Sequence, residues 1–277
     1  MTSLFTQECG SGVPVLVIPG WEMSGAVEAA DFEPIFTKTT GFRRIYVDLP
    51  GHGKTPAHGI QNLDDILSYL TKFIDARLGN ERFLVVGSSC GALFARTVAL
   101  KYREQIDGLL LRVPLIEPEN SKRDLDLFTP LVRDEEVMSS ISTEDKAQLG
   151  DVLIQTPAYV KTLTAKYKEF YLPAVEASDK EVLGVIRDDT KRYRLSLDLD
   201  KTDQRKLLAP TLIVCGRQDG VVGYRDSLRL LELYPRSTFA VLDRGGHDLP
   251  VDEQDVFEAL VLDWLKRVNE WGIGKDN

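Results

Sequence analysis

A serine between two glycines is the clearest chemical feature of this sequence. Residues 87–91 read Gly-Ser-Ser-Cys-Gly, after the apolar run 83–86 and before the helical pattern 92–100. This strand–turn–helix context is typical of a nucleophile elbow, with Ser89 at the positive end of a helix. Glycine is required two positions before and after the nucleophile because side chains there would collide, and Ser88 lacks that spacing. The pattern predicts Ser89 as nucleophile, although a turn of small residues without chemistry would also fit it.

A serine hydroxyl needs a general base, and the sequence offers three histidines, His52, His58 and His247. His247 follows a predicted strand and two glycines, so we expect it at the edge of the sheet where α/β proteins bind ligands. Asp219 ends another predicted strand-and-turn segment at the same edge. We predict that His247 is the base and that Asp219 orients its ring.

Other assignments of the base and the acid remain open. Glu117, just after the preceding strand, is the rival acid. Asp219 precedes a glycine and could be a turn residue, and His247 could be a loop histidine bonded to backbone. Asp243 and Asp248 are too close to His247 in sequence to orient its ring.

A serine nucleophile also requires backbone N–H groups where negative charge develops on the carbonyl oxygen. Cys90, the residue after the nucleophile, is expected to supply one. The loop 19–25 follows an early strand, and the N–H of Trp21 is the candidate for the second. The Trp21 indole would also form a pocket wall, although it could serve packing alone.

These residues require an alternating framework of strands and helices. The apolar patterns predict strands at 13–18, 43–48, 83–88, 107–113, 211–216 and 237–242, and helices at 62–78, 92–100, 224–234 and 253–270. Asn62 is a suitable N-cap and Gly79 a suitable stop for the first helix. Such alternation predicts a mostly parallel sheet covered by helices on both faces.

The alternation stops between 117 and 205, where the sequence is charged and mostly helical in spacing. We expect helices at 157–171 and 179–195, and we interpret 117–205 as a cap inserted into a core of 1–116 and 206–277. Aromatic and aliphatic residues recur in it at helical spacing: Phe128, Leu131, Tyr159, Leu163, Tyr167, Phe170 and Tyr171. A minority of them should face an apolar pocket, so a hydrophobic acyl group should be preferred over a charged one.

Length and composition set further limits. A chain of 277 residues with 43% hydrophobic and 28% charged residues fits one large α/β domain with an insertion. Its net charge of −9 argues against nucleic acid or an anionic membrane surface as partner. Cys9, Cys90 and Cys215 form no disulfide framework or metal cluster. With no signal-peptide or membrane-spanning pattern, we expect a cytoplasmic monomer or homodimer acting on a small molecule.

The sequence resembles the α/β-hydrolase superfamily, in its esterase and C–C hydrolase-like branch. The resemblance rests on five segments and on the order Ser89, Asp219, His247. The segments are Pro19-Gly20-Trp21, 48–55 (Asp-Leu-Pro-Gly-His-Gly-Lys-Thr), 87–91, 216–219 (Gly-Arg-Gln-Asp) and Gly246-His247. It implies the α/β-hydrolase fold with an eight-stranded sheet, a helical cap and no cofactor. It also implies a structural role for the loop around His52.

Two departures from the family pattern stand out. Pro19-Gly20 replaces the His-Gly of many relatives, which leaves the backbone role intact. Only residues 2–8 are available for the usual opening hairpin, which leaves the presence of the first strand open.

The leading interpretation is a serine hydrolase that forms an acyl-enzyme with a small, largely apolar ester, thioester or lactone. A C–C bond hydrolase could use the same three residues, and a ligand receptor without activity could retain them. A haloalkane dehalogenase is disfavoured because it needs a carboxylate where Ser89 stands. An aminopeptidase would need acidic cap residues, for which the candidates are Glu169, Glu176, Glu181 and Asp188.

Overall fold

The core of the molecule is a seven-stranded sheet. The computed structural model describes residues 3–150, 152–199 and 206–273. The strands are β1 (Thr6–Gly10), β2 (Val13–Ile18), β3 (Phe42–Val47), β4 (Phe83–Ser88), β5 (Ile106–Arg112), β6 (Thr211–Gly216) and β7 (Ser237–Leu242). They are ordered β1-β3-β2-β4-β5-β6-β7. Only β1 is antiparallel to its neighbour, pairing Thr6 with Val47 of β3.

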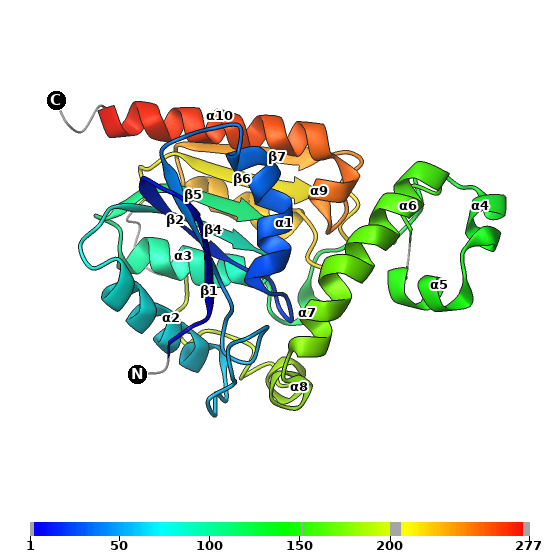
Figure 1. Ribbon diagram of the computed structural model, residues 1–277, viewed down its shortest axis with the longest axis horizontal. Coiled ribbons are helices and arrows are strands. Elements are labelled where there is room, and N and C mark those ends of the chain that lie inside the picture. Colours follow the sequence, from blue (N-terminus) through cyan, green and yellow to red (C-terminus); the bar gives the residue numbers. More distant parts are fainter. Residues whose placement is uncertain (1–2, 151, 200–205, 274–277) are drawn as a thin grey trace.

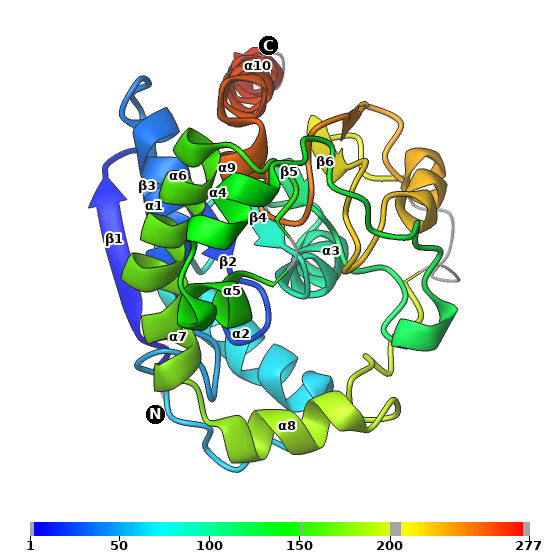
Figure 2. The ribbon, with the colours of Figure 1, turned by 90° about the vertical axis from the view of Figure 1, so that its right-hand side faces the viewer.

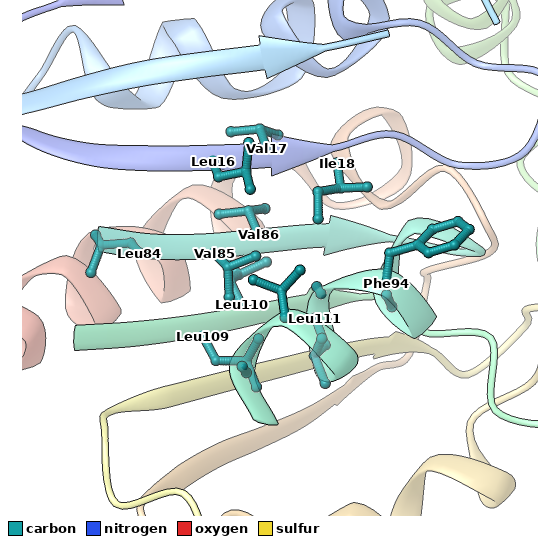
Figure 3. Packing of buried hydrophobic residues seen from close by; sticks show 14 of the residues in the cluster. Leu16, Val17, Ile18, Leu84, Val85, Val86, Phe94, Leu109, Leu110 and Leu111 are labelled. Atoms are coloured by element: carbon teal, nitrogen blue, oxygen red, sulfur yellow. The ribbon is translucent and has the colours of Figure 1, made fainter. Parts of the chain in front are cut away.

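The central strands are buried on both faces, as their continuous apolar sequences predict. Leu16 of β2, Val86 of β4 and Leu110 of β5 are fully inaccessible to solvent. Figure 3 shows these side chains packed between neighbouring strands, with Phe94 of the following helix near the end of β4. This core fixes the C-terminal ends of the strands, from which the candidate site is built.

Helices cover both faces of the sheet. Figure 1 shows α1 (Gly25–Phe36) and α10 (Gln254–Ile273) on one face, and α2 (Leu63–Arg77) and α3 (Gly91–Lys101) on the other. The predicted cap of α2 is confirmed, because the Asn62 side chain accepts a hydrogen bond of 2.9 Å from the Asp65 N–H.

The segment between β5 and β6 is helical. It contains η1 (Asn120–Lys122), α4 (Glu135–Ser140), α5 (Thr143–Leu149), α6 (Pro157–Lys166), the π-helical turn η2 (Tyr167–Tyr171), α7 (Leu172–Ala177) and α8 (Lys180–Asp188). Figure 1 shows α6 and α7 passing beside α1, whereas α4 and α5 project away from the sheet. Figure 2 shows these helices in front of the end of the sheet from which α3 starts.

The mostly parallel sheet and its six predicted strands are confirmed, and several finer expectations are corrected. The described residues contain seven strands rather than the eight implied by the resemblance, with β1 as the edge strand. The helix predicted at 157–171 continues through η2 into α7, and Pro173 lies two residues after the π-helical turn. The helix predicted at 179–195 ends at Asp188.

The C-terminal helices also differ from their predictions. The segment 224–234 is a 3₁₀ helix, η3 (Arg225–Glu232), and the last helix is preceded by a separate short one, α9 (Leu249–Asp252). No helix among the described residues has the length and apolar character required to cross a membrane.

Candidate active site

Ser89 occupies a strained turn between β4 and α3. Its φ of +52° lies in the left-handed region that non-glycine residues rarely adopt. A Cβ at Gly87 would lie 2.5 Å from the carbonyl oxygen of Gly91, and one at Gly91 would lie 2.4 Å from the carbonyl oxygens of Ile18 and Pro19. Both glycines are therefore required for this turn, as the sequence pattern predicts.

Three polar side chains from the ends of different strands form one hydrogen-bonded chain. His247, in the loop after β7, has its Nε2 at 3.1 Å from the Oγ of Ser89. Its Nδ1 lies 2.9 Å from the Oδ2 of Asp219, which follows β6. An ionised carboxylate can only accept, so Nδ1 carries the proton and Nε2 is free to accept from the serine. The arrangement has the geometry of a nucleophile, a base and an orienting acid.

The surroundings of Asp219 keep it ionised. Burial alone would raise its pKa, but the charge and hydrogen bond of His247 outweigh burial and hold the pKa below the ordinary value. The N–H groups of Val221 and Val222 contribute by donating to its Oδ1 at 2.8 and 3.0 Å. A fixed, ionised Asp219 can hold the imidazole in one tautomer and stabilise its protonated form.

The rival residues lie outside this hydrogen-bonded chain. The Glu117 carboxylate accepts from the Glu119 N–H and pairs with Arg194. His52 is fully buried, its Nδ1 donates to the Pro50 carbonyl, and burial lowers its pKa to about 4. His58 stacks on Tyr69.

Two backbone N–H groups are available beside Ser89. Neither Trp21 nor Cys90 donates its N–H to any acceptor in the described part of the chain. The Trp21 loop is close to the nucleophile, since a Cβ at Gly20 would lie 3.3 Å from that of Ser89. The Cys90 thiol is not a competing nucleophile at neutral pH, because burial raises its pKa to about 11.

A cavity of about 370 Å³ opens at Ser89 and His247. This volume is within the range of small-molecule sites. Apolar side chains from the core form much of its wall: Trp21, Met23, Val27, Val113, Leu115 and Val222. Of the cap aromatics singled out in the sequence, Tyr171 lines this cavity and the others do not. The four acidic residues considered for an aminopeptidase are exposed and absent from its wall.

A buried ionic cluster lies against the same cavity. Arg112, at the end of β5, donates to Glu28 at 2.8 Å and also bonds Asp31, both of which belong to α1. Lys166 of α6 lies 2.6 Å from Asp31 and 2.6 Å from Asp248, the neighbour of His247. Sequence reasoning missed this cluster, although an arginine at the end of an apolar strand was a signal for it.

The cluster also includes Ser88, the residue before Ser89. Ser88 donates its hydroxyl to Glu28 at 2.7 Å and accepts from Arg112 at 2.9 Å. Burial raises the pKa of Glu28, while the charge of Arg112 opposes that rise. Ser88, which adjoins Ser89, and Asp248, which adjoins His247, are thus connected through the same buried ionic cluster.

Two arginines, which the sequence analysis did not anticipate, add positive charge to this largely apolar cavity. Arg123, before α4, and Arg187, in α8, line the cavity. Both come from the segment between β5 and β6, whose placement over the site could not be derived from helical spacing. Among the described residues, no group of three or more His, Cys, Asp or Glu side chains could hold a metal ion.

The sequence matches the profile of the family described as alpha/beta hydrolase fold over residues 13–254. The chain belongs to this α/β-hydrolase family. The match spans strands β2 to β7, the helices between β5 and β6, and all three residues of the hydrogen-bonded chain.

Characterised relatives of this hydrolase divide between two chemistries. It is 26% identical over 276 residues to a pimeloyl-[acyl-carrier protein] methyl ester esterase of Shewanella woodyi, covering 96% of this chain and 99% of the relative. It is also 26% identical to a 2-hydroxy-6-oxononadienedioate/2-hydroxy-6-oxononatrienedioate hydrolase of Escherichia coli, covering 94% and 90%. An α/β-superfamily hydrolase of Oenococcus oeni shares the fold, with a TM-score of 0.84, 24% identity and 97% of each chain covered.

Proposed function

We propose that this hydrolase cleaves a small ester, thioester or lactone through an acyl-enzyme on Ser89. The observation that carries the proposal is the hydrogen-bonded chain from Asp219 through His247 to Ser89, open to a cavity of about 370 Å³. A serine hydroxyl is a weak nucleophile, and this arrangement provides the base that it needs.

In the first half of the reaction, the Ser89 Oγ attacks the substrate carbonyl carbon while its proton passes to the His247 Nε2. The negative charge that develops on the carbonyl oxygen is accepted by the N–H groups of Trp21 and Cys90. These donors are fixed before the reaction, so they stabilise the transition state without reorganising. The tetrahedral intermediate collapses, the leaving group takes the proton from His247, and the acyl group remains on Ser89.

In the second half, His247 removes a proton from a water molecule, which attacks the acyl carbonyl. The same two N–H groups stabilise the second oxyanion. Collapse of that intermediate returns the proton to Ser89 and releases the acid. Asp219 keeps its negative charge throughout and stabilises the imidazolium in both halves.

We assign the segment 117–205 as a cap over this site, with residues 151 and 200–205 lying outside the described part. Support comes from Arg123, Tyr171 and Arg187, which belong to this segment and line the cavity together with Ser89. A cap of this kind selects the substrate and limits the entry of water.

The decisive test is the variant Ser89→Ala. It should lose at least about 10³-fold in kcat toward 4-nitrophenyl butyrate. Its melting temperature should stay close to that of the wild type, and labelling by a fluorophosphonate probe should disappear. A folded variant that retained most of its turnover would exclude Ser89 as nucleophile.

A C–C bond hydrolase on the same three residues is the second candidate. It is favoured by the E. coli relative, whose name gives dicarboxylates as its substrates, and by the two arginines of the cavity wall. Parallel assays with 4-nitrophenyl esters and with a 2-hydroxy-6-oxo dienoate separate the two activities. Labelling by fluorophosphonate without turnover of either class would instead favour a ligand receptor.

A further inference from the structure

The two arginines of the cavity wall differ from the other charged groups at the site in having no carboxylate partner. Arg123 donates to three backbone carbonyls, from its Nε to Glu117 at 2.8 Å and from its Nη atoms to Val221 at 2.8 Å and Pro118 at 3.1 Å. Arg187 donates to the side chain of Asn120 at 3.0 Å. Neither forms a salt bridge with any residue that the structure describes.

The carboxylates at this cavity are already engaged. Glu28 pairs with Arg112, and Asp248 pairs with Lys166. Asp219, whose charge acts on Arg123, accepts from His247 and from two backbone N–H groups. Among the described residues, these carboxylates are held by other partners, and none lies within ion-pair distance of Arg123 or Arg187.

The two guanidinium groups also act on each other. Burial lowers the pKa of Arg123, and the positive charge of Arg187 lowers it further. Arg187 is held in place over the ring of Tyr193, with 4.3 Å between its Cζ and the ring centroid. Two half-buried like charges are costly when they lack a counter-charge, and a bound anion would remove that cost.

The arginines are positioned for binding before any ligand enters. Three carbonyl acceptors fix the Arg123 guanidinium and leave two of its five N–H donors unused. Tyr193 is buried and packs edge-on against Trp21, the candidate oxyanion residue, with ring centroids 4.9 Å apart. The planar guanidinium group of arginine can donate two parallel hydrogen bonds to the oxygens of a carboxylate. Because the group is already fixed in the free protein, less entropy is lost on binding.

We propose that Arg123 and Arg187 form an anion subsite and that the physiological substrate carries a carboxylate remote from the carbonyl that Ser89 attacks. The inference rests on the proposed hydrolase function and specifies its substrate class. It replaces the expectation of a hydrophobic acyl group drawn from the cap aromatics, of which only Tyr171 lines the cavity.

The test compares kcat/KM for two matched pairs of esters. One pair places the charge on the acyl side, with 4-nitrophenyl hydrogen adipate against 4-nitrophenyl heptanoate. The other places it on the leaving group, with 4-(butanoyloxy)benzoate against 4-(butanoyloxy)benzamide. The anionic ester should be preferred in at least one pair, which also identifies the side that faces the arginines.

Arg187→Gln should reduce that preference by about 10- to 100-fold, the range expected for a lost hydrogen bond to a charged group. Arg187→Lys keeps the positive charge but loses the planar guanidinium group and its paired hydrogen bonds. It should therefore retain part of the preference for the anionic ester. Arg192→Gln is the matched control, because Arg192 belongs to the same segment, pairs with Asp189 and does not line the cavity. It should behave as the wild type.

A binding measurement keeps the test independent of turnover. In the Ser89→Ala protein, the anionic ester of the preferred pair should bind more tightly than its neutral counterpart by calorimetry, and Arg187→Gln should abolish the difference. Equal affinities, or a preference that survives Arg187→Gln, would overturn the anion subsite. Fluorophosphonate labelling and neutral-ester turnover of the wild type distinguish this outcome from failure of the proposed hydrolase function.

Discussion

Backbone geometry, rather than side-chain chemistry alone, sets the position of Ser89, the proposed nucleophile. The φ of +52° at Ser89 is tolerated because Gly91 lets the start of α3 approach the loop after β2. That loop carries the Trp21 N–H. The close approach of Gly91 to Ile18 and Pro19 therefore fixes the positions of both the proposed nucleophile and the proposed oxyanion donor.

Gly91→Ala should therefore damage stability and activity together. Its Cβ would meet two backbone carbonyl oxygens at 2.4 Å, which cannot move as a side chain could. We expect a loss of about 1–3 kcal/mol in the free energy of unfolding, measured in urea, and a fall in kcat. Gly184→Ala is the control, because Gly184 lies in α8 with open space around it and should be neutral or slightly stabilising. Equal effects of the two changes would contradict the steric argument.

The acid of the site gives a second residue-level prediction. Asp219→Asn should lower kcat by about 10⁴, because an amide favours the wrong tautomer of His247. Glu117→Gln should be far milder, since Glu117 contacts Glu119 and Arg194 rather than the histidine. Steady-state kinetics on one ester decide between them, and the reverse ranking would move the acid to the end of β5.

At the level of elements, α9 connects the histidine loop to α6. The Asp252 carboxylate accepts from the Gly246 N–H at 2.6 Å and from the Tyr159 hydroxyl at 2.5 Å. Burial raises the pKa of Asp252 to about 6. The residue before His247 and a residue of the proposed cap thus share one carboxyl group that holds a proton under mildly acidic conditions.

This raised pKa predicts a pH-dependent stability. An unfolded aspartate titrates near pH 3.9, so between about pH 4 and 6 the folded protein retains a proton that the unfolded chain has lost. The free energy of unfolding should fall as pH rises through this window, by up to about 3 kcal/mol from this group. The Asp252→Asn variant should lack this component. Urea unfolding at several pH values measures the free energy of unfolding of the wild type and of Asp252→Asn. If the two proteins showed the same dependence on pH, Asp252 would not be the group responsible.

The sequence predicted secondary structure best where a residue pattern was consistent with only one type of element. Six strands with continuous apolar runs were recovered, and Asn62 capped its helix as expected. β1 was not recovered, because at a sheet edge it has no continuous apolar run and its residues remain partly exposed. Helices α4 and α5 were missed because they are short and bury no residue, which removes the periodic signal.

The same contrast holds for the site. Ser89, Asp219 and His247 follow strands of a single sheet, so topology alone brings them to one edge. Arg123 and Arg187 belong to the segment between β5 and β6, which contributes no strand to the sheet. No local sequence pattern determines where such a segment packs. Their proposed role depends on which partner each charged group at the cavity has, and the sequence alone does not give those partners.

For the whole molecule, Lys166 is a buried ionic connection between the proposed cap and the proposed core. It is largely buried and bridges Asp31 of α1 to Asp248 beside His247. These carboxylates outweigh the effect of burial and raise the pKa of Lys166, so it stays charged.

Lys166→Met should destabilise the protein by about 3–5 kcal/mol, because it leaves the Asp248 carboxylate buried without a cation. Lys168→Met is the matched control, since Lys168 is two residues away, half exposed and paired with Asp145 at the surface. Its effect should be within about 1 kcal/mol. Thermal and urea unfolding of both variants measure the difference, and similar losses would show that burial of the pair is unimportant.

The bridge made by Lys166 also limits how new specificities can arise in this scaffold. The three residues proposed for the chemical step lie in the proposed core, whereas the two arginines of the cavity lie in the proposed cap, so recombination between homologues could exchange the cap alone. A chimera that acquired an uncharged residue at position 166 would leave Asp248 without its cation and Asp31 with Arg112 alone. Substitutions at these three positions should therefore be inherited together, and any engineered graft of the segment should transfer them as one unit.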